Sequence, residues 1–190
     1  MKKPISTRML VLCALFTALI AVGAFLRVPI PVWPFTLQFL FANLAALLLG
    51  RRYGTIACAA YIVLGLLGLP IFTKGGGPQY IFEPTFGCIL GFVLGAFAAG
   101  TVVRHAKKSG FGVYLAAGLV NMACVYALGV AWFYAVKSFY LHDPIGVWPL
   151  FLTCFLPTIG VDVVKCVVSA LLAVRLVPIV GQQSPPMQAE

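Results

Sequence analysis

Charged residues, and acidic ones in particular, are scarce in this chain of 190 residues. Asp, Glu, Lys and Arg together make up 9% of it, whereas a water-soluble globular protein carries about 25%. Hydrophobic residues account for 62%, and the mean hydropathy is +1.06. Such a composition cannot cover a protein surface in water. It excludes a soluble domain and predicts an integral membrane protein whose apolar exterior faces the lipid bilayer.

The chain also lacks the residue patterns of several enzyme classes. It has two histidines, no H-E-x-x-H sequence, no Walker motif, and no second aspartate in a hydrophobic segment that could complete an aspartyl dyad. Its six cysteines stand singly, without a C-x-x-C pair, which favours small buried side chains over metal ligands. We therefore expect no catalytic residue, no metal site and no covalently bound cofactor.

Long hydrophobic segments make up most of the sequence. A helix that crosses a membrane needs about 20 residues, with a range near 17 to 25. Six segments approach that length: Met9–Leu26, Phe35–Gly50, Tyr53–Leu69, Phe86–Val103, Val113–Val136, and one from near Leu150 to near Val177. Pro157 lies inside the last segment, so we expect that helix to kink or to begin there. The prediction is an all-α bundle of six transmembrane helices, forming one domain over residues 1–190 with a flexible tail at 181–190.

The basic residues predict the orientation of this bundle. If the N-terminus is cytoplasmic, nine basic residues fall inside and three outside. The inner set is Lys2, Lys3, Arg8, Arg51, Arg52, Arg104, Lys107, Lys108 and Arg175, and the outer set is Arg27, Lys74 and Lys137. Lys and Arg accumulate on the cytoplasmic side of membrane proteins, so both termini are expected inside. The net charge of +9 is then explained by the membrane topology. Binding to nucleic acid would need a cluster of basic residues on one face, and the sequence shows no such cluster.

The first hydrophobic segment follows Lys2, Lys3 and Arg8, as the core of a cleaved signal peptide would. The segment is long for that role, and five similar segments follow it. We therefore take it as the first membrane span.

Two ionisable residues, Asp162 and Lys165, lie inside the last predicted span. An ionisable group at membrane depth costs at least ~2.5 to 3.5 kcal/mol and usually faces a cavity or a partner. Residues three apart share one face of a helix, so both side chains can point into the same pocket. We interpret them as substrate-binding residues. The alternative, a structural pair in which each residue only neutralises the other, stays open.

Polar or amphipathic residues in other predicted spans are candidates for the lining of that pocket. They are Gln38, Asn43, Asn121, Tyr126 and Trp132. A polar group at membrane depth is expected to have a hydrogen-bond partner. For Asn43 and Asn121 we favour a hydrogen bond between helices over contact with a ligand. Tyr126 lies in the middle of a span and is not explained as an interfacial aromatic residue.

Small residues recur along the first predicted helix at spacings of three and four. Ala14, Ala18 and Ala21 form this stripe, with Gly23 and Ala24 beyond it. Such a stripe permits the close approach of another helix. Packing within the chain would produce the same pattern, so the spacing leaves the partner open.

In order and spacing, several segments resemble the BioY family, the biotin-specific S components of energy-coupling factor (ECF) vitamin transporters. The matching segments are Ala14–Ala18, Pro34–Gln38, Tyr61–Pro70, Gly75–Gly77, Pro84–Gly87, Leu90–Phe92, Tyr126–Gly129 with Trp132, and Pro157 leading to Asp162 and Lys165. They cover nearly the whole chain. At Glu83 and Cys88 the sequence departs from the family pattern.

The resemblance implies a six-helix protein of the bacterial cytoplasmic membrane that binds biotin in its outer half. It implies a transmembrane coupling protein, the T component, and ABC-type ATPases as partners, with ATP used by those subunits. The substrate-binding residues it implies are Asp162, Lys165, Tyr126, Gln38, Thr85, Gly87 and Trp132. It also implies that Ala14 and Ala18 form the docking face for the coupling protein.

The function predicted from these observations is that of a high-affinity biotin-binding subunit that delivers the vitamin inward with ATP-driven partners. An S component for another vitamin, such as riboflavin or thiamine, is the first alternative. An intramembrane enzyme and a channel or purely structural membrane protein are the others.

Overall fold

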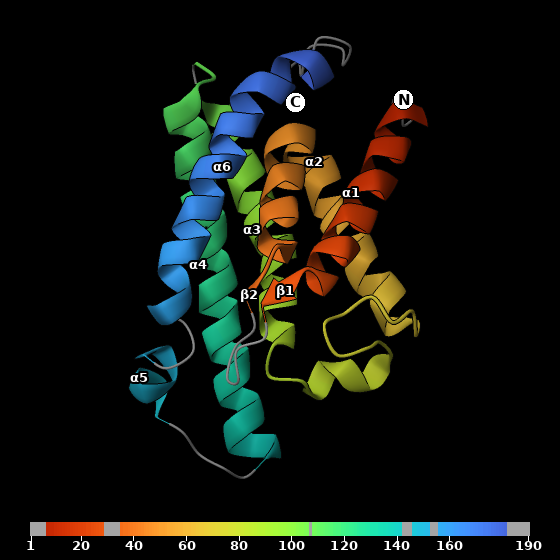
Figure 1. Cartoon of the computed structure of the whole chain (residues 1–190), viewed down its shortest axis with the longest axis vertical. Coiled ribbons are helices and arrows are strands. Elements are labelled where there is room, and N and C mark those ends of the chain that lie inside the picture. The colour runs from red at the N-terminus through yellow and green to blue at the C-terminus, as the bar shows by residue number, and fades with distance from the viewer. Residues whose placement is uncertain (1–6, 29–34, 107, 142–145, 153–155, 182–190) are drawn as a thin grey trace.

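The computed structural model describes residues 7–28, 35–106, 108–141, 146–152 and 156–181, which form a helical bundle (Figure 1). The helices are α1 (Thr7–Phe25), α2 (Gln38–Leu66), α3 (Phe86–His105), α4 (Phe111–Ala135), α5 (Val147–Leu150) and α6 (Leu156–Gly181). A 3-10 helix (Pro78–Phe82) precedes α3, and a π-helical turn (Val136–Tyr140) continues α4. Within the described residues, five helices are long and apolar enough to cross a membrane: α1, α2, α3, α4 with its π turn, and α6.

Helix α2 reverses direction at Gly50. This residue has φ 72° and ψ −174°, a conformation that only glycine adopts without strain. Beyond the turn, a Cβ added to Gly54 would lie 2.8 Å from the carbonyl oxygen of Ala45. In a continuous helix, residues nine apart are separated by about 13 Å along the axis. The predicted segments Phe35–Gly50 and Tyr53–Leu69 therefore correspond to two limbs of α2 that pack against each other.

Two helices begin later in the chain than the hydrophobic segments that predicted them. Phe35 and Thr36 form the two-residue strand β2, which pairs antiparallel with β1 (Arg27–Val28), and α2 begins at Gln38. The last long helix begins at Leu156, because α5 is a separate short helix. Pro157 thus lies in the first turn of α6, where a missing N–H removes no intrahelical hydrogen bond, and the prediction that a helix begins there is confirmed. The expected flexible tail lies outside the described residues from position 182 onward.

The helices pack in a simple order. Helix α1 lies mainly against α2, α3 lies between α2 and α4, and α6 packs on both α2 and α4. The start of α1 and the end of α6 lie at the same end of the bundle (Figure 1). The turn at Gly50 and the connection from α3 to α4 are at that end as well. The β1–β2 pair lies near the middle of the bundle, next to the other end of α1, and the loop before α3 lies toward the opposite end of the bundle.

Two predictions concern polar and sulfur-containing side chains inside the bundle. The amide nitrogen of Asn121 donates to Oδ1 of Asn43 over 3.0 Å, and both side chains are fully buried, which confirms the hydrogen bond between helices. The five described cysteines are free, and Cys13, Cys58 and Cys166 are buried. Cys154 lies outside the described residues.

Candidate ligand-binding site

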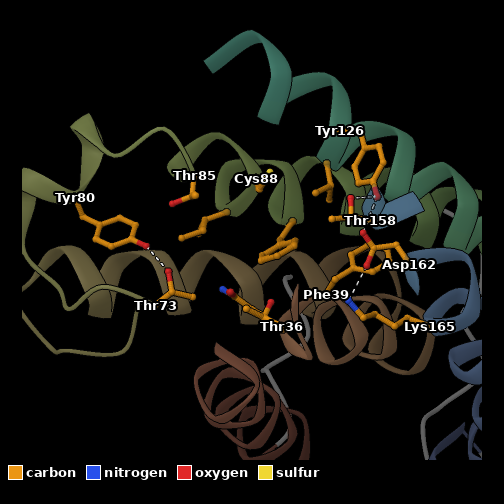
Figure 2. Close-up of a pocket in the computed structure, with 14 residues that line it drawn as sticks. Thr36, Phe39, Thr73, Tyr80, Thr85, Cys88, Tyr126, Thr158, Asp162 and Lys165 are labelled. Atoms are coloured by element: carbon orange, nitrogen blue, oxygen red, sulfur yellow. Dashed lines mark hydrogen bonds and ion pairs between the residues drawn. The ribbon is translucent and has the colours of Figure 1, made fainter. Parts of the chain in front are cut away.

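A cavity lies among α2, α3, α4 and α6, next to the β1–β2 pair (Figure 2). The connecting segments around β2 and before α3 complete its wall. Its lining residues are Thr36, Gln38, Phe39, Thr73, Tyr80, Thr85, Cys88, Ile89, Phe92, Val125, Tyr126, Thr158, Asp162 and Lys165. Five of the seven predicted substrate-binding residues are among them: Gln38, Thr85, Tyr126, Asp162 and Lys165.

One end of the cavity is ionic and is built by the first turns of α6 with one residue from α4. Lys165 Nζ lies 2.7 Å from Asp162 Oδ1, and the Tyr126 hydroxyl donates to Asp162 Oδ2 over 2.7 Å. Because its single proton goes to Asp162, the Tyr126 oxygen accepts from the hydroxyl of Thr158, 2.9 Å away. Figure 2 shows these side chains converging on the Asp162 carboxylate.

The Asp162–Lys165 pair is 9% and 8% exposed and carries no net charge. An ammonium has three N–H donors and a carboxylate about four acceptor sites. Both groups therefore keep hydrogen-bonding capacity beyond the bond that joins them. An uncharged ligand with adjacent donors and an acceptor could use this capacity without placing a new charge in the bundle.

The other end of the cavity is polar but uncharged. Thr73 and Tyr80 share a hydrogen bond of 2.8 Å there, at the far side of the cavity from Asp162 (Figure 2). Two further lining atoms, Gln38 Nε2 and Thr85 Oγ1, are buried with no hydrogen-bond partner in the protein. A buried polar group without a partner costs about 1 to 3 kcal/mol. These atoms thus indicate that a ligand or water completes their hydrogen bonds.

Two contacts hold the loop before α3 over this polar end. Arg27 of β1 donates to the Thr73 carbonyl over 2.7 Å. Lys74 forms an ion pair of 2.8 Å with Glu83, one of the two departures from the family pattern. Cys88, the other departure, lines the cavity directly. The contact with Arg27 therefore joins β1 to the loop before α3.

Gly87 and Trp132 were predicted to bind substrate, but the structure does not bring them to the cavity lining. A Cβ at Gly87 would lie 2.3 Å from the Trp132 Cβ, so Gly87 allows close packing of α3 on α4. The Trp132 indole N–H donates to the Ile81 carbonyl over 3.1 Å. Both residues therefore support the loop and the helix pair that form the cavity wall.

The sequence reasoning missed several lining residues. Thr158 is four residues before Asp162, so its place on the same face of α6 could have been predicted from helical spacing. Thr36, Thr73 and Tyr80 lie in connecting segments, and no periodic pattern places them.

Ala14 and Ala18 lie on the exposed side of α1, away from the cavity. The predicted stripe is divided, because Gly23 and Ala24 are buried. A Cβ at Gly23 would lie 2.9 Å from the backbone of Gln38 in α2. Only the first part of the stripe is therefore free to meet another protein.

The site contains no metal-binding cluster: across the described ranges, no group of three or more His, Cys, Asp and Glu side chains could hold a metal ion.

Comparison with known proteins gives consistent matches over nearly the whole chain. The model of the BioY family matches residues 1–182. The chain is 44% identical over 170 residues to a protein of Thermotoga maritima described as biotin transporter BioY, covering 89% of this chain and 95% of that one. It is 40% identical over 176 residues to a probable biotin transporter BioY of Lysinibacillus sphaericus, covering 93% and 90%.

A solved structure has the same fold. It is the crystal structure of the S-component for biotin from an ECF-type ABC transporter, with a TM-score of 0.77 and 26% sequence identity. The match covers 95% of this chain and 96% of that one.

Proposed function

The chain belongs to the BioY family, and from this we propose that it is the biotin-binding S component of an ECF-type vitamin uptake transporter. It is an integral membrane protein and a substrate-binding subunit, not an enzyme. The observation that carries the proposal is the cavity in which α6 presents Asp162 and Lys165 side by side. Such a pair at membrane depth is expected to serve recognition.

Biotin has polar groups that match the two ends of this cavity. Its ureido ring offers two N–H donors and one carbonyl acceptor, which suit the Asp162 carboxylate and the Lys165 ammonium. Its valerate carboxylate is anionic and would repel Asp162 if it lay beside the neutral ion pair. We therefore place the ureido ring at Asp162 and Lys165. The carboxylate then extends toward Thr73, whose carbonyl accepts from Arg27.

This orientation predicts how biotin methyl ester, which has no carboxylate charge, responds to Lys165→Met. Loss of a hydrogen bond from a charged group should weaken binding by roughly 10- to 100-fold. If Lys165 contacts the ureido carbonyl, the loss is the same for biotin and for its ester in titration calorimetry. If the variant weakens biotin but not the ester, Lys165 contacts the carboxylate and the proposed orientation is wrong. Lys74→Met, in the exposed ion pair, is the control.

The proposed topology has six membrane crossings, one for each limb of α2, with both termini in the cytoplasm. In its support, six described basic residues lie toward the end of the bundle where α1 begins and α6 ends: Arg8, Arg51, Arg52, Arg104, Lys108 and Arg175. Arg27, Lys74 and Lys137 lie toward the other end. This distribution agrees with the preference of basic residues for the cytoplasmic side.

Cysteine labelling in intact cells tests the topology. A membrane-impermeant maleimide should react with a Lys74→Cys variant, since the Lys74 side chain is 56% exposed at the outer end. A Lys108→Cys variant should react only after the membrane is permeabilised; the residue beside it, Lys107, was first predicted to be protected but lies outside the described residues. The parent protein, with its own cysteines, sets the background. The reverse labelling pattern would overturn the orientation.

Any ATP hydrolysis that drives delivery of biotin inward must belong to partner proteins, because the sequence has no Walker motif that could bind ATP. We assign ATP hydrolysis to ABC-type ATPases and assign contact with the T component to the exposed Ala14 and Ala18. The membrane is the bacterial cytoplasmic membrane.

Mass spectrometry of small molecules released from the purified protein tests the proposed substrate. Biotin is expected, with saturable binding of added biotin in calorimetry. Release of riboflavin or thiamine in its place would identify an S component for another vitamin. Substrate flux without saturable binding would instead indicate a channel.

A further inference from the structure

The polar, uncharged end of the cavity has no cation in its lining. The charged lining residues, all within the described ranges, are Asp162 and Lys165, and they neutralise each other. Biotin brings one negative charge, on its valerate carboxylate. In the orientation proposed above, this carboxylate lies toward the end where Thr73 and Tyr80 share their hydrogen bond (Figure 2). A cation that binds the carboxylate there has to come from a residue beside the lining.

Two cations lie on or against the loop before α3, and one of them already has an acidic partner. Lys74 forms its ion pair of 2.8 Å with Glu83, so these two charges offset each other. Arg27 donates from Nη1 to the Thr73 carbonyl over 2.7 Å and makes no other hydrogen bond or ion pair with the described residues. A guanidinium has five N–H donors. Arg27 therefore keeps most of its donors, and its whole charge, for an anion.

The strand pairing places Arg27 next to the cavity. In the antiparallel β1–β2 pair, Arg27 lies directly opposite Thr36, which lines the cavity. Residues opposite each other in such a pair have their side chains on the same face, with Cβ atoms about 4.5 to 5.5 Å apart. Arg27 is thus adjacent to two lining residues, Thr36 through the strand pairing and Thr73 through the hydrogen bond. Its guanidinium lies at the rim of the cavity and is exposed.

We propose that Arg27 determines specificity for an anionic ligand by binding the biotin carboxylate through the N–H donors that Thr73 leaves unused. The inference rests on the proposed function and on the orientation of biotin given there. The planar, paired donors of arginine match the two oxygens of a carboxylate. The hydrogen bond to Thr73 holds the guanidinium in place before the ligand binds, so less side-chain freedom is lost on binding.

Titration calorimetry with biotin and biotin methyl ester on the purified full-length chain tests this role. Arg27→Gln removes the charge but keeps an N–H donor. Its affinity for biotin should fall roughly 10-fold, between the effects of an exposed ion pair and of a hydrogen bond to a charged group, whereas its affinity for the ester should change less than about two-fold. Arg27→Lys keeps the charge without the paired donors and should recover part of the loss for biotin.

The matched control is Lys108→Gln. It also removes one exposed positive charge, but from the connection between α3 and α4, at the end of the bundle where α1 begins. It should change neither affinity, because Lys108 does not line the cavity and is not near the β1–β2 pair.

Salt dependence gives a second measurement, on the parent protein and without any variant. The attraction between exposed charges is screened by ions, and the Debye length falls from about 10 Å at 0.1 M to about 3 Å at 1 M ionic strength. Raising the NaCl concentration over this range should weaken binding of biotin several-fold, since Arg27 is exposed. Binding of the uncharged ester should stay nearly constant.

Three results would count against these expectations in different ways. Equal losses of biotin and ester affinity in Arg27→Gln would show that Arg27 only holds the loop through Thr73, and the proposal would be wrong. An unchanged biotin affinity in that variant would also overturn it. If the parent protein binds neither ligand, the proposed function itself fails, and the inference fails with it.

Discussion

Replacing Asp162 by Asn and Lys165 by Met together should weaken biotin binding by roughly one to two orders of magnitude, which is the effect of losing a charge-assisted hydrogen bond. The double variant is informative because it leaves no unpaired charge in the membrane. Each single variant leaves one buried charge without its partner, which costs about 3 to 5 kcal/mol and combines a loss of stability with a loss of binding. Titration calorimetry on monodisperse protein gives the affinity.

The control for this double variant is the other described ion pair. Lys74→Met with Glu83→Gln removes a pair whose side chains are 56% and 31% exposed, and binding should stay within about five-fold of the parent protein. If Asp162 and Lys165 only balance each other, their double variant should bind biotin as tightly as the parent does. That result would leave the cavity without its assigned recognition groups. A loss confined to the Asp162/Lys165 variant supports recognition of biotin by the pair.

Replacing Ala14 or Ala18 by Trp should abolish assembly with the T component and the ATPases while leaving biotin binding intact. Both alanines lie on the exposed side of α1, so the indole has room in the isolated subunit. It prevents close approach only when another helix packs there. Copurification of the partners measures assembly, and calorimetry on the isolated subunit measures binding.

Ala116→Trp is a matched control, since Ala116 is an exposed alanine on α4, on a different helix. It should leave both assembly and binding unchanged. Normal assembly of the Ala14 and Ala18 variants would remove these residues from the docking face. Equal loss of assembly in the Ala116 variant would show that any bulky group on the surface disturbs the complex.

Much of the membrane architecture could be predicted from the sequence because hydropathy is a property of contiguous residues. The limits of the helices depended on local chemistry as well: Pro157 has no N–H and therefore lies in the first turn of α6. Phe35 was assigned to a helix because it is apolar, but its backbone pairs with β1, and that pairing is a contact between segments. An apolar residue can lie in a membrane helix or in a short strand, so its apolar character alone does not predict which of the two it forms.

The sequence by itself determined the bilayer environment, the apolar segments and the pairing of Asp162 with Lys165, because composition, segment length and a spacing of three residues are local. Only the tertiary structure decided which polar groups share a cavity. Thr73 lines the cavity, and its carbonyl accepts a hydrogen bond from Arg27, which is 46 residues away in the sequence. No pattern in a single sequence predicts such a contact. Gly87 and Trp132 are absent from the lining because the packing of α3 on α4 determines how each helix is rotated about its axis, and that rotation turns these two residues toward each other.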